Sequence, residues 1–230
     1  MNYKTETLKV YEEFPDYFNE KFEEYASKYI KGIMEEVCSV IPKNSKIFDL
    51  GSGSGNHAIF LKNKGFDVTC FDISEKMLQK CKEKGLKTIK GDFENINISK
   101  NSFDVVWAYT SLLHVPKSNV PDIIDKISTI LKKNGYLVLS LKEGIGEGFV
   151  DFKKGGKRWF SLYKHEEIFK LLNNKFEIIK NWRVQVIDNS GNYPKNSQNS
   201  LMDNSEKQIF INRIIHNENK TFLDYLCKKP

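Results

Sequence analysis

Residues 49–55, with the sequence DLGSGSG, form the most informative segment of this chain, because they join a short apolar run to a helical pattern. The run at 46–50 (KIFDL) has the length and composition of a buried strand, and the run at 57–65 (HAIFLKNKG) those of a helix ended by Gly65. Glycines are needed at such a turn because side chains would keep a ligand away from the backbone, and because some positions can require a positive φ angle. The segment therefore predicts a strand, a ligand-binding turn and a helix in succession.

Strand and helix patterns continue to alternate as far as residue 142. Further strands are expected at 67–73, 86–91, 102–109 and 136–142, and further helices at 74–85 and 119–135. In the helix at 74–85, Ser74 is the expected N-cap, Glu75 lies in the first turn and Gly85 follows the end. Alternation of this kind with continuous apolar strands predicts a parallel sheet covered by helices on both faces.

The segments on either side of this alternation are less regular. Residues 5–42 carry apolar side chains at three- and four-residue steps, interrupted by Pro15, so two helical pieces are expected there. Residues 143–163 are rich in glycine and charge, and we expect a functional loop because the segment is too long for a simple connection. The rest of the chain predicts a helix at 165–174, a long strand at 175–187, a polar segment at 188–220 and a last strand at 221–229.

Acidic residues end successive strands around the glycine turn. Asp72 closes the second strand, 21 residues after Gly51, where a doubly wound fold places a carboxylate beside a ribose bound at the first strand. Asp92 and Phe93 follow the third strand and offer an acceptor for an exocyclic amine and an aromatic face for a purine. Each acid alone could instead stabilise the start of a helix. Together with Asp49 on the first strand, they converge on one turn and predict a nucleotide-type ligand.

A nicotinamide dinucleotide fits this turn less well than another nucleotide does. The dinucleotide fingerprint requires a third glycine three positions after Gly53, and this chain has Asn56 there. That departure favours a different cofactor.

At these residues the chain resembles the class I S-adenosylmethionine-dependent methyltransferases, in particular the small Methyltransf_11/25-like enzymes. The resemblance covers about residues 7 to 183 and rests on the glycine motif, on GDF at 91–93, on SFDVVWAYTSLLHVP at 102–116 and on LKKNGYLVLSLKEG at 131–144. It implies that S-adenosylmethionine is the cofactor and that S-adenosylhomocysteine is the product formed from it. The cofactor contacts that it implies are Asp49, Gly51, Ser52, Gly53, Gly55, Asp72, Ile73, Met77, Gly91, Asp92 and Phe93.

The resemblance also implies the fold. A single α/β Rossmann-like domain over residues 1–230 would hold a seven-stranded sheet in the order 3-2-1-4-5-7-6, with strand seven antiparallel and helices on both faces. Residues 1–42 would form an N-terminal helical lid in which Tyr11 contacts the cofactor, while Phe18 stands where a second tyrosine is usual. Residues 143–163 and 188–220 would form the acceptor-side loops.

The acceptor side offers fewer signals than the cofactor side. Methyl transfer depends mainly on holding a nucleophile in line in a dry pocket. If the acceptor must lose a proton, His114 at the exit of the fourth strand is the candidate catalytic base, although a lone histidine is more often structural. Arg158, Trp159 and Tyr163 are candidate substrate contacts, because a guanidinium pairs with carboxylates or phosphates and aromatic rings stack. The alternative is that the aromatic residues anchor the loop to the core.

Composition bounds the remaining possibilities. The chain has 40% hydrophobic and 29% charged residues, with neither an apolar run of membrane-spanning length nor a secretion signal, so we expect a soluble, cytoplasmic protein. Its four cysteines form no CxxC pair, so neither a disulfide framework nor a metal site is expected. The net charge of +6 comes from lysines interspersed with acids, which favours a solvated surface over a nucleic-acid interface.

We therefore expect a methyltransferase that acts on an oxygen or nitrogen atom of a small molecule, as a monomer or homodimer. RNA or peptide methylation is an alternative that draws on Lys153, Lys154, Lys157 and Arg158. Two further alternatives are a non-catalytic protein that binds S-adenosylmethionine and an NAD-dependent oxidoreductase, which turnover and cofactor preference would distinguish.

Overall fold

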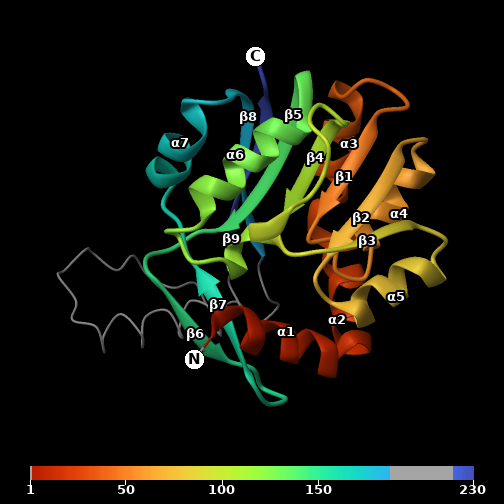
Figure 1. The fold of residues 1–230 in the computed structure, drawn as a ribbon. Helices are drawn as coiled ribbons and strands as arrows, with labels where there is room; N and C mark the ends of the chain where they lie inside the picture. Colours follow the sequence, from red (N-terminus) through yellow and green to blue (C-terminus); the bar gives the residue numbers. More distant parts are fainter. Residues whose placement is uncertain (1, 187–219) are drawn as a thin grey trace.

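Seven strands form one sheet in the computed structural model, which describes residues 2–186 and 220–230 (Figure 1). The order is β3-β2-β1-β4-β5-β9-β8; β1 to β5 pair in parallel, and β9 runs antiparallel to both of its neighbours. This order confirms the expected topology, because β8 and β9 take the places of the sixth and seventh strands. The strands are β1 Lys46–Leu50, β2 Asp67–Asp72, β3 Lys87–Lys90, β4 Phe103–Tyr109, β5 Leu131–Lys142, β8 Glu177–Val186 and β9 Lys220–Lys228.

Helices cover both faces of this sheet. One face is covered by α3 (Lys31–Val40), α4 (Asn56–Asn63) and α5 (Glu75–Glu83), and the other by α6 (Val120–Ile130) and α7 (His165–Asn173). In β1, Ile47 packs in the first of these layers and Phe48 in the second, because successive side chains of a strand point to opposite faces. Of the helices described, none is both long and apolar enough to cross a membrane.

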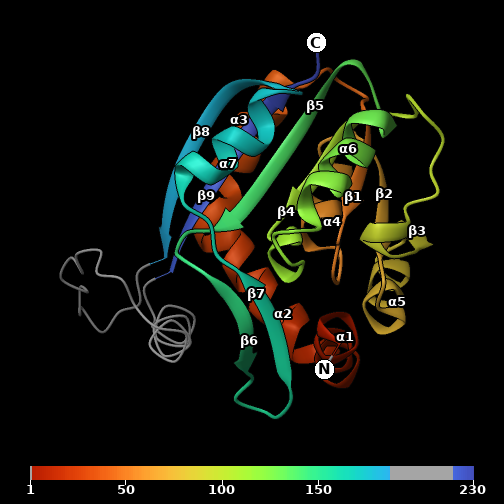
Figure 2. The same cartoon turned by 60° about the vertical axis from the view of Figure 1, so that its left-hand side comes forward.

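The N-terminal helices lie beside the carboxyl ends of the central strands (Figures 1 and 2). The first helix, α1 (Tyr3–Glu13), is capped by the side chain of Asn2. Pro15 opens the second, α2 (Pro15–Tyr25), at a position where its missing N–H group leaves no hydrogen bond unmade. A π-helical segment, η1 (Ala26–Ile30), then leads directly into α3. The two expected helical pieces on either side of Pro15 are therefore confirmed.

The segment at 143–163 is only partly a loop, which corrects the expectation from the sequence. It folds into an antiparallel hairpin of β6 (Glu147–Asp151) and β7 (Lys157–Ser161), whose turn contains Gly155 and Gly156 with φ angles of 111° and 81°. A Cβ on Gly156 would lie 2.6 Å from Cγ2 of Val10, so the hairpin turn packs closely against α1. Figure 2 shows the hairpin running alongside α1 and α2.

The helix expected at 119–135 is shorter in the structure than the sequence predicted. It ends at Ile130, and β5 begins at Leu131, which pairs with Phe103 before a shift in register. Asn134 has a φ angle of 62° and lies at this irregularity, where a regular helix cannot continue. The acceptor-side segment expected at 188–220 lies, up to residue 219, outside the described residues.

Candidate functional site

A cavity lies at the carboxyl ends of β1, β2 and β4, and α1 roofs it. It is lined by all of the predicted cofactor contacts except Gly55 and Gly91, and by His114. The side chains that α1 contributes to the lining are Tyr3, Lys4, Thr7, Leu8 and Tyr11. The structure therefore brings the strand-end residues and the predicted lid tyrosine to one place.

The glycines of the turn have different tasks. Gly51 and Gly53 line the cavity with φ angles of 79° and 52°, a region that residues with a side chain rarely adopt. Gly55 starts α4 with a φ angle of 78°, and a Cβ there would lie 2.7 Å from Cδ1 of Leu86. A Cβ on Gly91 would overlap the ring of Phe71. A Cβ on Gly51 would lie 2.4 Å from Cβ of Ser111, so Gly51, Gly55 and Gly91 are all required for packing around the cavity, whereas Gly53 exposes open backbone to it.

Two buried carboxylates lie on the floor of the cavity. Asp49 is 3% exposed, and its Oδ2 atom has no hydrogen-bond partner in the described structure. Burial, with the nearby charge of Asp72, raises the pKa of Asp49 to about 8. Asp72 accepts hydrogen bonds from the backbone N–H groups of Gly53 and Ser74, each at 2.9 Å, while burial raises its pKa. Once ionised, such a carboxylate can only accept, so its unpartnered oxygen calls for a ligand that donates hydrogen bonds or carries positive charge.

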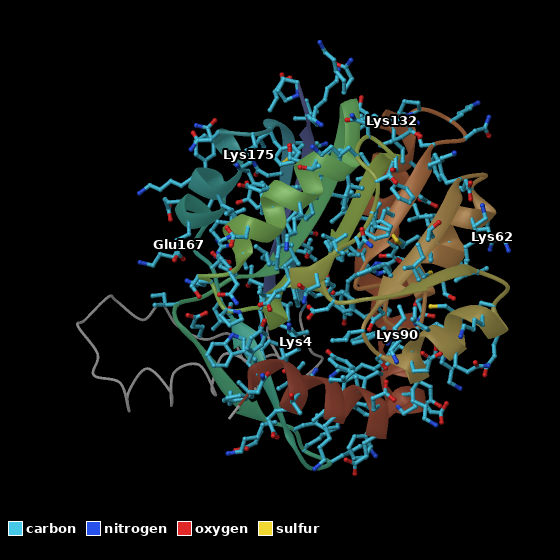
Figure 3. The ribbon with its side chains drawn as sticks, viewed as in Figure 1. Lys4, Lys62, Lys90, Lys132, Glu167 and Lys175 are labelled. Carbon is cyan, nitrogen blue, oxygen red and sulfur yellow. The ribbon has the colours of Figure 1, made fainter. Side chains whose placement is uncertain are left out.

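The start of α1 is tied to the end of the cavity that lies beyond β3. The ammonium group of Lys4 pairs with Asp92 and lies 2.8 Å from Oε2 of Glu94. The other carboxylate oxygen of Glu94, Oε1, accepts a hydrogen bond from the hydroxyl of Tyr3. Burial alone would raise the pKa of Glu94, but these hydrogen bonds outweigh that effect and lower the pKa to about 2. Figure 3 shows Lys4 between α1 and the rest of the domain. No pattern in the sequence indicated Tyr3, Lys4 or Glu94, because their roles depend on the fold of α1 over the sheet.

A hydrogen-bonded chain joins Tyr11 to three other residues. Nδ1 of His114 lies 2.6 Å from the carbonyl oxygen of Trp159, which can only accept, so Nδ1 carries the ring proton. The other nitrogen, Nε2, lies 2.8 Å from the hydroxyl oxygen of Tyr11 and accepts a hydrogen bond from that hydroxyl group. Tyr11 in turn accepts from Nη1 of Arg158 at 3.2 Å. Burial, with the nearby charge of Arg158, lowers the pKa of His114 to about 3, so the ring is neutral near pH 7.

Arg158, Trp159 and Tyr163 lie behind the cavity wall and are not part of the lining. Trp159 donates its backbone N–H to Thr7 at 2.9 Å and its indole N–H to Ser161 at 3.1 Å. The guanidinium group of Arg158 lies within 5.6 Å of the centroids of four aromatic rings, those of Tyr11, Phe18, Phe152 and Phe160. These contacts fit the anchoring alternative, in which residues of this segment hold the hairpin against α1.

The far end of the cavity is aromatic and was not predicted. Tyr25, His57 and Tyr109 line it from α2, α4 and the end of β4. The indole N–H of Trp107 donates to Nδ1 of His57 at 3.2 Å, and burial lowers the pKa of His57 to about 4, so this ring is also neutral. The hydroxyl of Tyr109 donates to the buried Asp224 of β9. For Tyr109, its position as the last residue of a strand could have indicated a place in the site.

Comparison with known proteins agrees with this geometry. Residues 48–139, which include the glycine turn and the acids, match the Methyltransf_11 family, described as a methyltransferase domain. This part of the chain is therefore a methyltransferase domain of the class I S-adenosylmethionine-dependent type. The cofactor of that class is S-adenosylmethionine, whose cationic methionine end and ribose hydroxyls suit the acceptor groups of Asp49 and Asp72.

Curated relatives match part of the chain. Sarcosine/dimethylglycine N-methyltransferase of Aphanothece halophytica is 32% identical over 119 residues, which are 46% of this chain and 42% of that protein. Ubiquinone/menaquinone biosynthesis C-methyltransferase UbiE of Rickettsia prowazekii is 34% identical over 140 residues, which are 51% of this chain and 54% of that protein. The chain thus spans about half the length of these relatives.

Solved structures share the fold over more of the chain. An S-adenosylmethionine-dependent methyltransferase of Methanosarcina mazei superposes with a TM-score of 0.66 at 16% identity, covering 84% of this chain and 96% of that one. The 1,6-didemethyltoxoflavin-N1-methyltransferase of Burkholderia thailandensis, solved with its acceptor and S-adenosylhomocysteine, gives 0.59 at 14% identity, covering 94% and 90%. At these identities the likeness establishes the fold alone.

Proposed function

We propose that this protein transfers the methyl group of S-adenosylmethionine to a nitrogen or oxygen atom of a small molecule. The observation that carries the proposal is the roofed cavity at the glycine turn, in which Asp49 has an unpartnered oxygen and Asp72 lies at the end of β2. Asp72 would hold the ribose hydroxyls, Asp49 would face the methionine end, and Phe93 would stack on the adenine. Gly53 supplies open backbone between these groups, since a Cβ there would meet nothing nearer than Phe22 at 3.9 Å.

The protein's own contribution to methyl transfer is positioning and the exclusion of water. When bound, S-adenosylmethionine supplies an electrophilic methyl carbon attached to a positively charged sulfur. The roof formed by α1 keeps water out of the cavity, and the side chains of the lining restrict the approach of the acceptor. A dry site strengthens the interaction between buried carboxylates and a cationic group.

His114 fits a positioning role better than that of a general base. Its only basic nitrogen, Nε2, accepts from Tyr11, and its low pKa leaves little tendency to take a proton near pH 7. We propose that His114 and Arg158 fix the hydroxyl of Tyr11 at the cavity wall. An acceptor that presents a free lone pair needs no base for the transfer itself.

The charge distribution supports a small acceptor over a nucleic acid. Lys62, Lys90, Lys132 and Lys175 lie apart from one another in Figure 3, on α4, β3, β5 and the turn after α7. At the hairpin turn, Lys153 and Lys154 lie over the ring of Tyr17 in α2.

Calorimetric titration with S-adenosylmethionine, S-adenosylhomocysteine and NAD tests the cofactor. We expect micromolar binding of the first two and none of NAD. Asp72→Ala should abolish this binding, whereas Asp67→Ala, at the opposite end of β2, should leave it unchanged. A methyl-transfer assay with an acceptor panel then tests turnover. Preference for NAD, or no binding at all, would refute the proposal.

A further inference from the structure

A buried acid lies behind the aromatic end of the cavity and is not part of its lining. Asp224 of β9 is 0% exposed and accepts from the hydroxyl of Tyr109 through Oδ2. Its second oxygen, Oδ1, has no hydrogen-bond partner of good geometry, although Ser140 of β5 faces Asp224, and among the described residues no lysine or arginine forms an ion pair with it. A carboxylate in this condition is costly unless a donor or a positive charge is brought to it.

Two tyrosines connect this acid to the cavity. Tyr109 lines the cavity and holds one oxygen of Asp224. Tyr25 also lines the cavity, and its hydroxyl is buried without a partner. Burial, with the nearby charge of Asp224, raises the pKa of Tyr25. Tyr109 thus stands between Asp224 and the cavity, and a cationic group bound against the two tyrosines would offset the charge of the buried acid.

The surrounding side chains favour a cation. The rings of Tyr109 and His57 meet edge to face at 5.1 Å, and the ring of Tyr25 packs against Phe222 at 5.7 Å. Aromatic faces attract cations, and the neutral His57 contributes no opposing charge. The one lysine of the described lining is Lys4, which is paired with Asp92 and Glu94 at the other end of the cavity. Arg158, which could have held an anionic acceptor, is enclosed behind Tyr11.

We propose that the subsite lined by Tyr25 and Tyr109, with Asp224 behind them, receives an amine, and that the acceptor of this protein is therefore an amine that is methylated on nitrogen. The proposal rests on the methyltransferase function and deepens it.

In the transfer, the lone pair of the amine nitrogen forms the new C–N bond while the bond between sulfur and the methyl carbon breaks. The positive charge passes from sulfur to nitrogen, and the sulfur leaves with the bonding pair as a neutral thioether. Asp224 and the two rings stabilise charge that develops on nitrogen, so their effect is greater in the transition state than before it. A protonated amine would first release its proton to solvent.

A quaternary ammonium probe tests the subsite without turnover. Choline and its uncharged isostere 3,3-dimethylbutan-1-ol differ in charge and hardly in shape. We expect protein saturated with S-adenosylhomocysteine to bind choline about tenfold more tightly than the isostere, as measured by ligand-observed NMR titration. Asp224→Asn should reduce that preference to less than threefold, and Tyr25→Leu should reduce it as well, whereas Tyr136→Leu at the amino-terminal part of β5 should not.

Each outcome of this experiment decides the proposal. An equal affinity of the wild-type protein for the two probes would overturn it, as would an unchanged preference in Tyr25→Leu. A loss of S-adenosylhomocysteine affinity in Asp224→Asn, with the preference for choline intact, would also overturn it and assign the acid to the cofactor. If Asp224→Asn does not fold, as judged by circular dichroism, the preference measured in Tyr25→Leu decides alone. Failure of the methyltransferase function is recognised separately, because the wild-type protein would then not bind S-adenosylhomocysteine.

Discussion

The hydroxyl of Tyr11 in α1 lies 2.8 Å from Nε2 of His114, and this hydrogen bond joins the roof of the cavity to the segment that follows β4. Each partner is partly buried and is held by a further group, Arg158 on one side and the carbonyl oxygen of Trp159 on the other. Segments that are far apart in the sequence therefore meet at one hydroxyl group.

Removing that hydroxyl should weaken both the fold and the site. In Tyr11→Phe, Nε2 of His114 is left buried without a donor, and we expect a loss of about 1–3 kcal/mol in the free energy of unfolding. Affinity for S-adenosylhomocysteine should fall with it, because α1 is held less firmly. Thermal denaturation and calorimetry measure the two effects. Tyr17→Phe, on the neighbouring helix, is the matched control, and equal losses in the two variants would contradict this role.

The raised pKa of Asp49 makes cofactor binding dependent on pH. Because the folded apoprotein holds a proton on Asp49 up to about pH 8, and an ordinary carboxyl releases it near pH 4, the apoprotein binds more protons than the unfolded chain between these values. This group therefore makes stability fall as the pH rises from about 4 to 8. A cationic ligand favours the ionised form, so affinity for S-adenosylmethionine should increase from pH 6 to pH 8, by up to tenfold per unit.

Titration of the affinity against pH checks this prediction. Asp49→Asn should lower the affinity and flatten the profile. A profile of unchanged slope in Asp49→Asn would show that another group is responsible.

The ion pairs at the start of α1 should control how readily the roof opens. Lys4→Ala removes the link from α1 to Asp92 and Glu94. Because such partly exposed pairs contribute little, we expect a loss of less than about 1 kcal/mol in stability, but faster hydrogen exchange in α1 and faster release of S-adenosylhomocysteine. Lys9→Ala, on an exposed position of the same helix, should change neither rate. Identical exchange in the two variants would refute this assignment.

The hairpin turn offers a matched pair of glycines. Both have positive φ angles, but a Cβ on Gly156 would lie 2.6 Å from Val10, whereas a Cβ on Gly155 would meet nothing within 4 Å. Gly155→Ala should cost about 1 kcal/mol from backbone strain, and Gly156→Ala about 1–3 kcal/mol more because the hairpin must move away from α1. Chemical denaturation measures the difference, and a larger loss in Gly155→Ala would contradict the packing described.

The cofactor half of the site could be predicted because its signals are local. The glycine turn and the acids Asp49, Asp72 and Asp92 each lie at a strand end, and a parallel sheet brings such ends to one edge. The periodicity of the strands and the N-cap at Ser74, which accepts from the backbone N–H of Met77, were readable for the same reason.

The acceptor half could not be predicted because its partners are distant in the sequence. Arg158 lies in a charged segment that suggested an exposed anion-binding residue, but rings from α1, α2 and the hairpin enclose it. Asp224 lies in a run that shows only a strand, and its contact with Tyr109 spans 115 residues. No spacing rule connects such pairs, since tertiary packing alone creates them.

The packing of the hairpin against α1 has a kinetic consequence. Trp159 donates its backbone N–H to Thr7, Gly156 packs on Val10, and Lys4 of the same helix is bound to Asp92, so displacing the helix disturbs the lining of the cavity. We expect both reactants to enter past this helix in a compulsory order, in which the cofactor enters first and its demethylated product leaves last. Competitive inhibition by S-adenosylhomocysteine against S-adenosylmethionine, with noncompetitive inhibition against the acceptor, is the initial-rate pattern that such an order produces.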